Sequence, residues 1–297
     1  MMAKAAQLPA DEVFFDLEDS VPPASKQAAR RAVVEALEGN DYGGRTIGVR
    51  INAIDTKWAA DDLAVVVGDA GSRLDCVLVP KVQHAHEVNF VEHMLRMVEA
   101  NTELDRHIGI EAQIESATGL ENISEIAGAS GRLEALVFGP ADMSASLGLP
   151  ATTPGLPMPG YPGDHWHAVL VRILVVARAA GLQAIDGPHL AIKDLNGLRQ
   201  GATRASALGY DGKWAVHPGQ IETLNNVFTP SQEDFDRAEA LLERYRRATE
   251  DEQRGAVMFG NEMIDEASAK MATAVVHRGR AAGLVARTTP EEMEDEH

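Results

Sequence analysis

Cysteine is almost absent from this chain, because Cys76 is the only one in 297 residues. A single cysteine excludes an intrachain disulfide and makes a cysteine-based metal site implausible, so a reducing, cytoplasmic setting is predicted. Long apolar runs are also lacking. The most apolar helical stretch, Ala168 to Ala180, is interrupted by Arg172 and Arg178. We therefore predict that no segment spans a membrane.

Basic residues are scarce as well. Lysine and arginine number 27 against 45 aspartates and glutamates, which gives a net charge of −18. Binding to nucleic acid or to an anionic membrane depends on clustered lysines and arginines, so neither partner is expected. One phosphorylated ligand, held by a few local basic groups, remains compatible with this charge.

What the sequence does contain is a regular alternation of short β-rich runs and helical patterns, typical of an α/β fold. Several runs are apolar on both faces, as in a parallel sheet covered by helices. The runs are Val13–Leu17, Thr46–Ile51, Asp75–Pro80, His107–Ile114, Ala135–Phe138, Gln183–Ile185 and Lys213–Val216. Seven such units, where eight would close a TIM (β/α)₈ barrel, predict such a barrel with one unit missing or hidden. A doubly wound open sheet is the alternative, although no glycine-rich phosphate fingerprint follows any run.

The C-terminal third has its own pattern. Ser231 and Asp234 have capping-box spacing and predict a helix start. The segment 256–265, centred on Gly260-Asn261, predicts a hairpin that leads into a final helix ending near Leu284. We expect a barrel domain over residues 1–250, a C-terminal extension over 251–287 and a disordered acidic tail over 288–297. The Pro/Gly-rich stretch 148–164 predicts a long functional loop.

Polar side chains follow the predicted strands at their carboxyl ends, which is where chemistry occurs in barrels. They include Asp16 to Asp19, Arg50, Lys81, Glu115, Asp142, Asp186 and His217. Carboxylates converging without paired histidines favour a hard cation such as Mg²⁺, for which Glu115 and Asp142 are the candidate ligands. The alternative is that both only stabilise helix starts. Arg50 could bind a substrate carboxylate or oxyanion, or simply pair with the Asp16–Asp19 cluster.

At these positions the sequence resembles the CoA-ester lyases related to the citrate lyase β subunit and malyl-CoA lyase, in the HpcH/HpaI aldolase superfamily. The matching stretches run in order from about Lys4 to Leu284. They are Phe15 to Pro23 (FDLEDSVPP), Val49 to Asn52 (VRIN), Val79 to Lys81 (VPK), Gln113 to Ser116 (QIES), Phe138 to Asp142 (FGPAD), Ile185 to Pro188 (IDGP), Gly212 to Pro218 (GKWAVHP) and Asn226 to Ser231 (NVFTPS). The fifth loop and the last motifs look more like malyl-CoA lyase.

The resemblance implies a TIM-barrel lyase that cleaves a 3-hydroxyacyl-CoA thioester by retro-Claisen chemistry, releasing an acyl-CoA and a small 2-oxo acid. It implies that Glu115 and Asp142 bind Mg²⁺, or Mn²⁺ in its place. Glu18 and Asp19 would hold the ion's waters and orient its ligands. Arg50 would neutralise charge on the reacting oxygens. Lys4, Lys81, Asp186 and His217 are assigned to substrate or CoA binding, with Lys4 near the CoA phosphates.

Asp265 is the most specific assignment that the resemblance supports. It lies in a segment that forms, in the family, a lid over a neighbouring subunit's active site, and its carboxylate exchanges a proton with the acyl-CoA α-carbon. A homo-oligomer, a trimer or a hexamer, is therefore expected. The alternative is that Asp265 only caps the final helix.

The sequence departs from the family in one respect, because the strand that carries an Arg-Ser pair and a Pro-Gly turn has no counterpart here. We expect either a start that lies inside the true protein or an unclosed barrel. The leading function is malyl-CoA or β-methylmalyl-CoA cleavage to glyoxylate. Citramalyl-CoA cleavage, a malate-synthase-like thioesterase, a pyruvate-enolate aldolase and a non-catalytic subunit that binds a carrier protein remain alternatives.

Overall fold

The computed structural model describes residues 2–150, 156, 158 and 160–287. The chain packs as two compact units, one up to Asn225 and one from Asn226 onward. The boundary falls inside helix α11 (Ile221–Phe228). The predicted long loop at 148–164 lies partly outside the described residues, and the predicted acidic tail at 288–297 lies wholly outside them.

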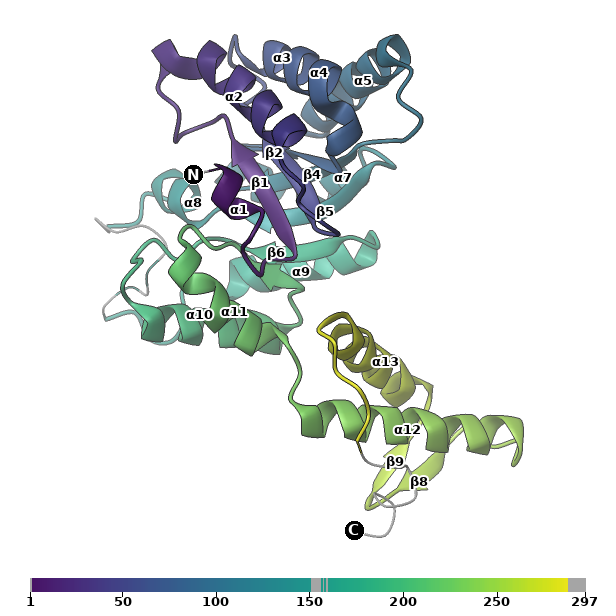
Figure 1. Cartoon of the computed structure of the whole chain (residues 1–297). Coiled ribbons are helices and arrows are strands. Elements are labelled where there is room, and N and C mark those ends of the chain that lie inside the picture. Colours follow the sequence, from purple (N-terminus) through teal and green to yellow (C-terminus); the bar gives the residue numbers. More distant parts are fainter. Residues whose placement is uncertain (1, 151–155, 157, 159, 288–297) are drawn as a thin grey trace. The chain divides into compact units, whose positions relative to one another are not determined.

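The first unit is built on a seven-stranded parallel sheet in which strand order follows chain order (Figure 1). The strands are β1 (Glu12–Asp16), β2 (Thr46–Arg50), β3 (Cys76–Val79), β4 (Gly109–Ile114), β5 (Leu133–Phe138), β6 (Gln183–Asp186) and β7 (Gly212–Lys213). All seven predicted strands are present, so the α/β prediction is confirmed. β7 is shorter than expected, because regular pairing with β6 stops at Lys213.

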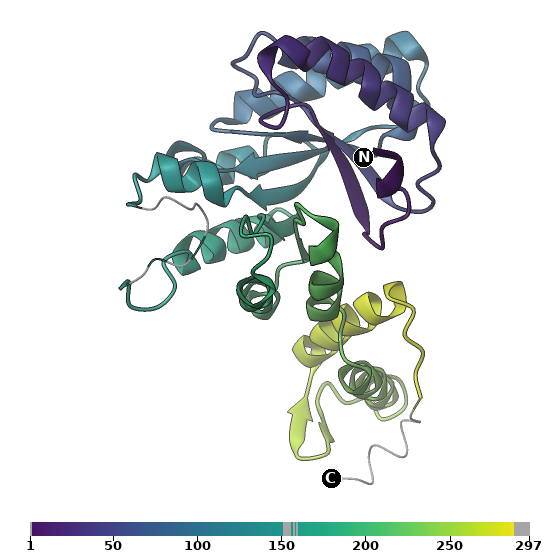
Figure 2. The ribbon, with the colours of Figure 1, turned by 60° about the vertical axis from the view of Figure 1, so that its left-hand side comes forward.

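Helices connect successive strands and lie along the outer side of the curled sheet (Figures 1 and 2). In this unit they are α1 (Met2–Ala5), α2 (Lys26–Gly39), α3 (Ala59–Asp62), α4 (Gly68–Ala70), α5 (Ala85–Thr102), α6 (Ala117–Glu121), α7 (Ile123–Ala127), α8 (Pro140–Ser146), α9 (His167–Ala179), α10 (Leu195–Leu208) and α11. The arrangement is a TIM-barrel-like half-barrel. In the part of the chain that the structure describes, β1 and β7 are not paired with each other.

An apolar layer fills the inside of the curled sheet. Trp214, just after β7, stacks on Phe14 of β1 with ring centroids 4.5 Å apart, and packs with Leu78, Val137 and Ile185. Because side chains alternate along a strand, Glu12 and Asp16 share the face of Phe14, one on each side of this layer. The sheet therefore carries polar groups above and below one apolar belt.

The second unit contains α12 (Gln232–Glu250), the hairpin of β8 (Val257–Phe259) and β9 (Glu262–Ile264), and α13 (Glu266–Ala281). The hairpin and final helix match the prediction, and Ser231 caps α12 by accepting from the Asp234 N–H at 3.0 Å. Phe235 of α12 packs against Ala272 and Val276 of α13. Helix α12, which the sequence assigns to the barrel, thus packs with the extension.

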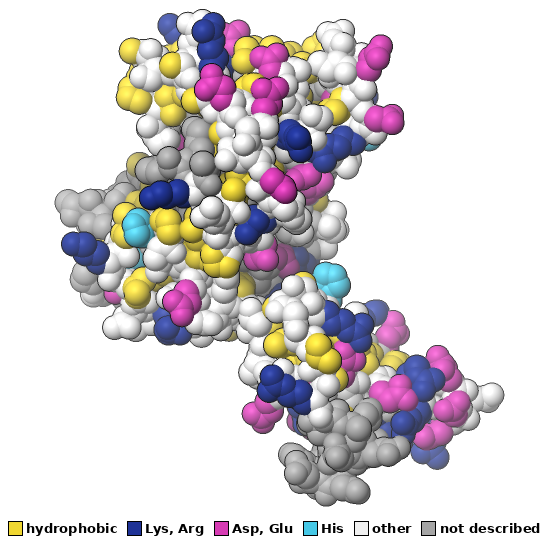
Figure 3. All heavy atoms as spheres, viewed as in Figure 1, with side chains coloured by type: hydrophobic (Ala, Val, Ile, Leu, Met, Phe, Trp, Pro, Cys, Tyr) yellow, Lys and Arg dark blue, Asp and Glu magenta, His cyan; other side chains and the backbone are white. Residues whose placement is uncertain are grey.

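Charged side chains of both signs are interspersed over this second unit (Figure 3). On α12, Arg246 pairs with Glu243 and Glu250 at 2.8 and 2.7 Å. Such exposed pairs contribute little to stability because solvent screens them, so apolar packing holds the unit together. Among the described residues, none of the helices combines the length and apolar character that crossing a membrane requires.

Candidate active site

Arg50 and Asp16 form a bidentate ion pair at the carboxyl ends of β2 and β1. The Arg50 guanidinium donates through Nε and one terminal nitrogen to the two Asp16 oxygens, both at 2.8 Å. Burial alone would raise the pKa of Asp16, but the paired guanidinium lowers it below its usual value. The ion pair that the sequence left open as the alternative role of Arg50 is therefore present.

Lys81 contacts most of the predicted site carboxylates. Its backbone adopts a left-handed conformation, with φ of 55°, immediately after β3. That turn directs the backbone N–H to Glu115 Oε1 at 2.7 Å, while the ammonium donates to Glu18 Oε1 at 2.6 Å. The same ammonium lies 3.3 Å from Asp19 and 3.9 Å from Asp142. One residue thus brings together four of the predicted site carboxylates.

Glu115 ends β4 and is 3% exposed. Its Oε2 accepts a hydrogen bond from the Gln113 amide at 2.7 Å. Burial and the nearby Asp142 carboxylate raise the pKa of Glu115 to about 8. Gly139 leaves the space that this carboxylate occupies, because a Cβ at that position would overlap it.

Asp142 lies in the first turn of α8, and its side chain is 41% exposed. Both carboxylates are oxygen donors and suit a hard cation, since a bound ion would relieve the repulsion between them. Mg²⁺ binds through one or two carboxylates and keeps water or substrate on its remaining positions. The donor set of Glu115 and Asp142 therefore fits such an ion.

A cleft of about 480 Å³ adjoins this cluster, and Glu18, Asp19 and Lys81 form part of its wall. Trp58, Lys26 and Asn52 line it as well. A larger hollow of about 730 Å³ lies near the amino ends of β4 and β5. There Glu99 is paired with Arg132, and both side chains are less than 10% exposed. The predicted site carboxylates Glu18 and Asp19 line the smaller cleft.

Three predicted binding residues do not join the cluster. Asp186 is 1% exposed and is paired with the Lys213 ammonium at 2.6 Å. His217 caps a short turn by accepting from the Gly219 N–H at 3.0 Å. Lys4 is exposed near the end of α1. The structure gives Asp186 and His217 local structural contacts, and their roles in ligand binding stay predictions.

Asp265 belongs to the second unit and caps α13. Its Oδ1 accepts from the N–H groups of Ala267 and Ser268 at 3.0 and 3.1 Å. These hydrogen bonds lower the pKa of Asp265, chiefly through Ser268. The capping alternative is thus present, and the carboxylate is held in its ionised form.

Sequence reasoning missed two residues that build the site. Gln113 orients Glu115, and the signal was the run of polar residues at every second position of β4. Lys26, which is buried, donates to the backbone oxygens of Leu17 and Glu18 at 2.7 and 2.8 Å and fixes the loop after β1. No pattern in the sequence distinguishes Lys26 from an exposed helical lysine.

The half-barrel and the carboxylates at its strand ends define an α/β enzyme of the TIM-barrel class. The family profile of HpcH/HpaI aldolase/citrate lyase matches residues 1–218, and the chain belongs to this family. Its members include CoA-ester lyases of the malyl-CoA lyase and citrate lyase β types, and this chain is a lyase of that kind.

Named relatives cover almost the whole chain. It is 36% identical to the L-malyl-CoA/beta-methylmalyl-CoA lyase of Rhodobacter capsulatus, over 94% of this chain and 90% of that protein. It is 33% identical to the malyl-CoA/beta-methylmalyl-CoA/citramalyl-CoA lyase of Chloroflexus aurantiacus, over 95% of this chain and 83% of that protein. The protein CitE of Mycobacterium tuberculosis, solved with magnesium, acetoacetate and coenzyme A, is 31% identical with a TM-score of 0.71, covering 94% of this chain and 92% of that one.

Proposed function

We propose that this chain cleaves malyl-CoA or β-methylmalyl-CoA to an acyl-CoA and glyoxylate. The observation that carries the proposal is the convergence of Glu115, Asp142, Lys81 and Arg50 at the carboxyl ends of the strands. The names of the Rhodobacter and Chloroflexus relatives support the substrate. The magnesium and coenzyme A bound to the Mycobacterium protein support the cofactor and the thioester class.

Glu115 and Asp142 would hold Mg²⁺ or Mn²⁺. When bound, the ion supplies Lewis-acid polarisation of the substrate's hydroxyl and carboxylate oxygens. Gln113 and the Lys81 N–H hold the Glu115 carboxylate in place. The ammonium of Lys81 and the carboxylates of Glu18 and Asp19 border the cleft and orient the polar end of the substrate.

Cleavage transfers the proton of the 3-hydroxyl group to solvent water and breaks the bond between the two carbons that carry the hydroxyl and the thioester arm. The 2-oxo acid leaves, and the electron pair becomes the acyl-CoA enolate. Arg50 is positively charged, because Asp16 and Glu18 raise its pKa against the effect of burial. It stabilises the negative charge that develops on oxygen.

The enolate takes a proton at its α-carbon, and we assign this exchange to Asp265. Its lowered pKa suits the ionised form, which removes the α-proton in the condensation direction. In the cleavage direction the same group, once protonated, returns that proton. We further propose that Asp265 acts on the site of a neighbouring subunit in a homotrimer or hexamer.

The first experiment measures glyoxylate release from malyl-CoA with Mg²⁺, with EDTA and with an Asp142→Ala variant. Release that needs the ion and is lost in the variant supports the proposal. Citramalyl-CoA is the second substrate to try, because the Chloroflexus relative is named for it and the two differ by one methyl, a difference worth about 1–3 kcal/mol. No release from either thioester contradicts the proposal.

A further inference from the structure

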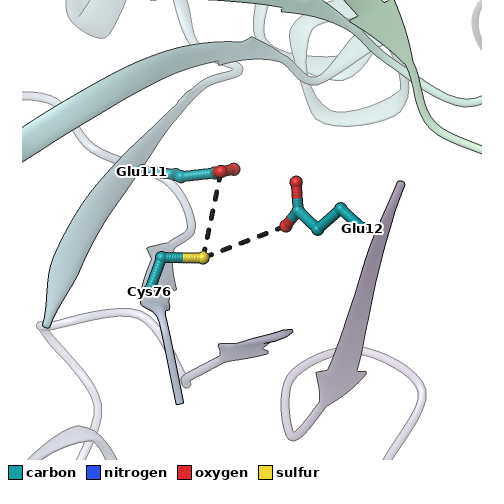
Figure 4. A group of neighbouring side chains, drawn as sticks. All are labelled: Glu12, Cys76 and Glu111. Atoms are coloured by element: carbon teal, nitrogen blue, oxygen red, sulfur yellow. Dashed lines mark hydrogen bonds between the residues drawn. The ribbon is translucent and has the colours of Figure 1, made fainter. Parts of the chain in front are cut away.

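A second polar cluster lies at the opposite end of the sheet from the active site. Glu12 begins β1, Cys76 begins β3, and Glu111 lies in β4, so residues far apart in the chain meet at the edge of the apolar layer of Trp214, to which Cys76 itself belongs. Figure 4 shows the three side chains converging. The Cys76 sulfur is 3.9 Å from one oxygen of Glu12 and 3.9 Å from one oxygen of Glu111.

The cluster is buried and short of partners. Cys76 is 0% exposed and Glu111 is 6% exposed. The Oε2 atom of Glu111 has no hydrogen-bond partner among the described residues, although it is fully buried. The two sulfur contacts are long, and a thiol is a weak donor. Within the described residues, neither Glu12 nor Glu111 forms an ion pair with lysine or arginine.

A third carboxylate, that of Glu134, lies near the cluster because of a bulge in the sheet. Ile110 pairs with Leu133 but Glu111 pairs with Ala135, so Glu134 is an extra residue on β5. Such bulges redirect a side chain. A Cβ on Gly109 would overlap the Glu134 carboxylate, so glycine is needed at this position. Gly109 is two residues before Glu111 on β4 and therefore faces the same side of the sheet.

Electrostatics make this arrangement costly without a cation. Burial raises the pKa of Glu12 to about 7, and burial together with Glu12 and Glu134 raises the pKa of Glu111. Burial and the same carboxylates raise the pKa of the Cys76 thiol. An unpaired charge is strongly disfavoured at such a position, so without a cation these groups stay protonated. Buried charges in proteins are therefore paired or bind metals.

We propose that Glu12, Cys76 and Glu111 form a zinc site at the base of the half-barrel. Their ligand atoms all lie within 4.8 Å of one another. Sulfur at about 2.3 Å and oxygen at about 2.1 Å from one tetrahedral Zn²⁺ lie about 3.6 Å apart, so the 3.9 Å separations close with a small movement.

The thiolate selects the ion. Mg²⁺ prefers oxygen donors, whereas Zn²⁺ binds thiolate and carboxylate together. Binding releases the Cys76 proton and any carboxyl proton to solvent, and Glu12, which is only half-buried, opens the site on one side. The ion would link β1, β3 and β4, so its role is structural. A single cysteine makes a metal site implausible from the sequence, but the fold brings two carboxylate ligands next to it.

Cobalt titration tests the proposal with a signature that only one residue can produce. Co²⁺ substitutes for Zn²⁺, and a cobalt–thiolate charge-transfer band in the near ultraviolet can arise only from Cys76, the single cysteine. We expect one equivalent of Co²⁺ to produce this band and Zn²⁺ to abolish it. An Asp142→Asn variant should keep the band, because the ion at the active site has oxygen ligands alone.

Two ligand variants complete the test. Glu111→Gln keeps the cysteine, so we expect the band with at least tenfold weaker affinity, and Cys76→Ala should show no band. Zn²⁺ should raise the melting temperature of the unaltered chain and of Asp142→Asn, but not of Cys76→Ala. Absence of the band in the unaltered chain, or equal affinity in Glu111→Gln, overturns the proposal. Melting in EDTA shows that each variant is folded, and Glu12→Gln gives a second comparison should Cys76→Ala not fold.

Discussion

Arg50 is held by Asp16 through two parallel hydrogen bonds of 2.8 Å, so the guanidinium at the active site has a fixed plane. This geometry requires the fork of an arginine and the two oxygens of one carboxylate. Both residues end neighbouring parallel strands and are directly paired in register. The strand pairing itself therefore orients this cation at the carboxyl ends of β1 and β2.

We predict that Arg50→Lys lowers kcat for malyl-CoA cleavage by about 10²–10³-fold, because a lysine cannot hold the same plane or reach the same oxyanion. Steady-state kinetics with saturating Mg²⁺ measure this loss. Arg172→Lys, on an exposed helix far along the chain, is the matched control and should change kcat less than twofold. Equal activity of Arg50→Lys and the unaltered chain would show that the guanidinium does not stabilise the reaction.

The raised pKa of Glu115 predicts a pH-dependent stability. Its folded pKa of about 8 lies above the value of 4.5 for an unperturbed glutamate, so its contribution is complete below pH 4.5 and is lost as the pH rises through 8. In EDTA, the free energy of unfolding should therefore fall over this window. Glu115→Gln should reduce this fall in the free energy of unfolding by at most about 5 kcal/mol.

Urea unfolding at several pH values measures this dependence. Glu12, with a pKa of about 7, acts in the same direction, so Glu12→Gln is measured beside Glu115→Gln to separate the two groups. Saturating Mg²⁺ should remove the contribution of Glu115 to the pH dependence of the free energy of unfolding, since binding requires the ionised carboxylate. A Glu115→Gln variant with the pH dependence of the unaltered chain would contradict the assignment.

Gly139→Ala should disturb the active site directly, because the new methyl group would overlap the Glu115 carboxylate. We expect the apparent affinity for Mg²⁺ in the cleavage assay to fall at least tenfold, together with a loss of stability of about 1–3 kcal/mol. Gly201→Ala is the control, since a Cβ there meets open space within α10. It should stabilise the chain by about 0.5–1 kcal/mol at unchanged activity.

Asp265 both caps α13 and is our proposed proton-exchange group, and one substitution separates these roles. Serine is as good a cap as aspartate, so Asp265→Ser should preserve the melting temperature while kcat falls by about 10²-fold or more. Ser231→Ala, which removes the cap of α12, is the converse control. It should cost about 1 kcal/mol of stability and leave kcat unchanged. Full activity of Asp265→Ser would leave Asp265 as a cap alone.

Much of the fold could be predicted because its signals are local. Short runs such as Cys76 to Val79 are apolar on both faces, and a two-sided apolar run of that length indicates a covered parallel strand. Glu115 and Asp142 were identifiable because Glu115 directly follows β4 and Asp142 lies in the short turn and helix start after β5. Lys26 was not, because a buried lysine in an amphipathic helix has no local mark and its partners are backbone oxygens.

The sequence by itself determined the succession of strand and helix units, the family resemblance and the acidic character of the strand ends, since these are carried by short stretches of neighbouring residues. Only the tertiary structure decided which polar groups share a partner. Asp186 is paired with Lys213, and Glu12, Cys76 and Glu111 meet across 35 to 64 residues of chain. The physical reason is register: a bulge and the alternation of side chains set which face each group occupies, and no local pattern encodes either.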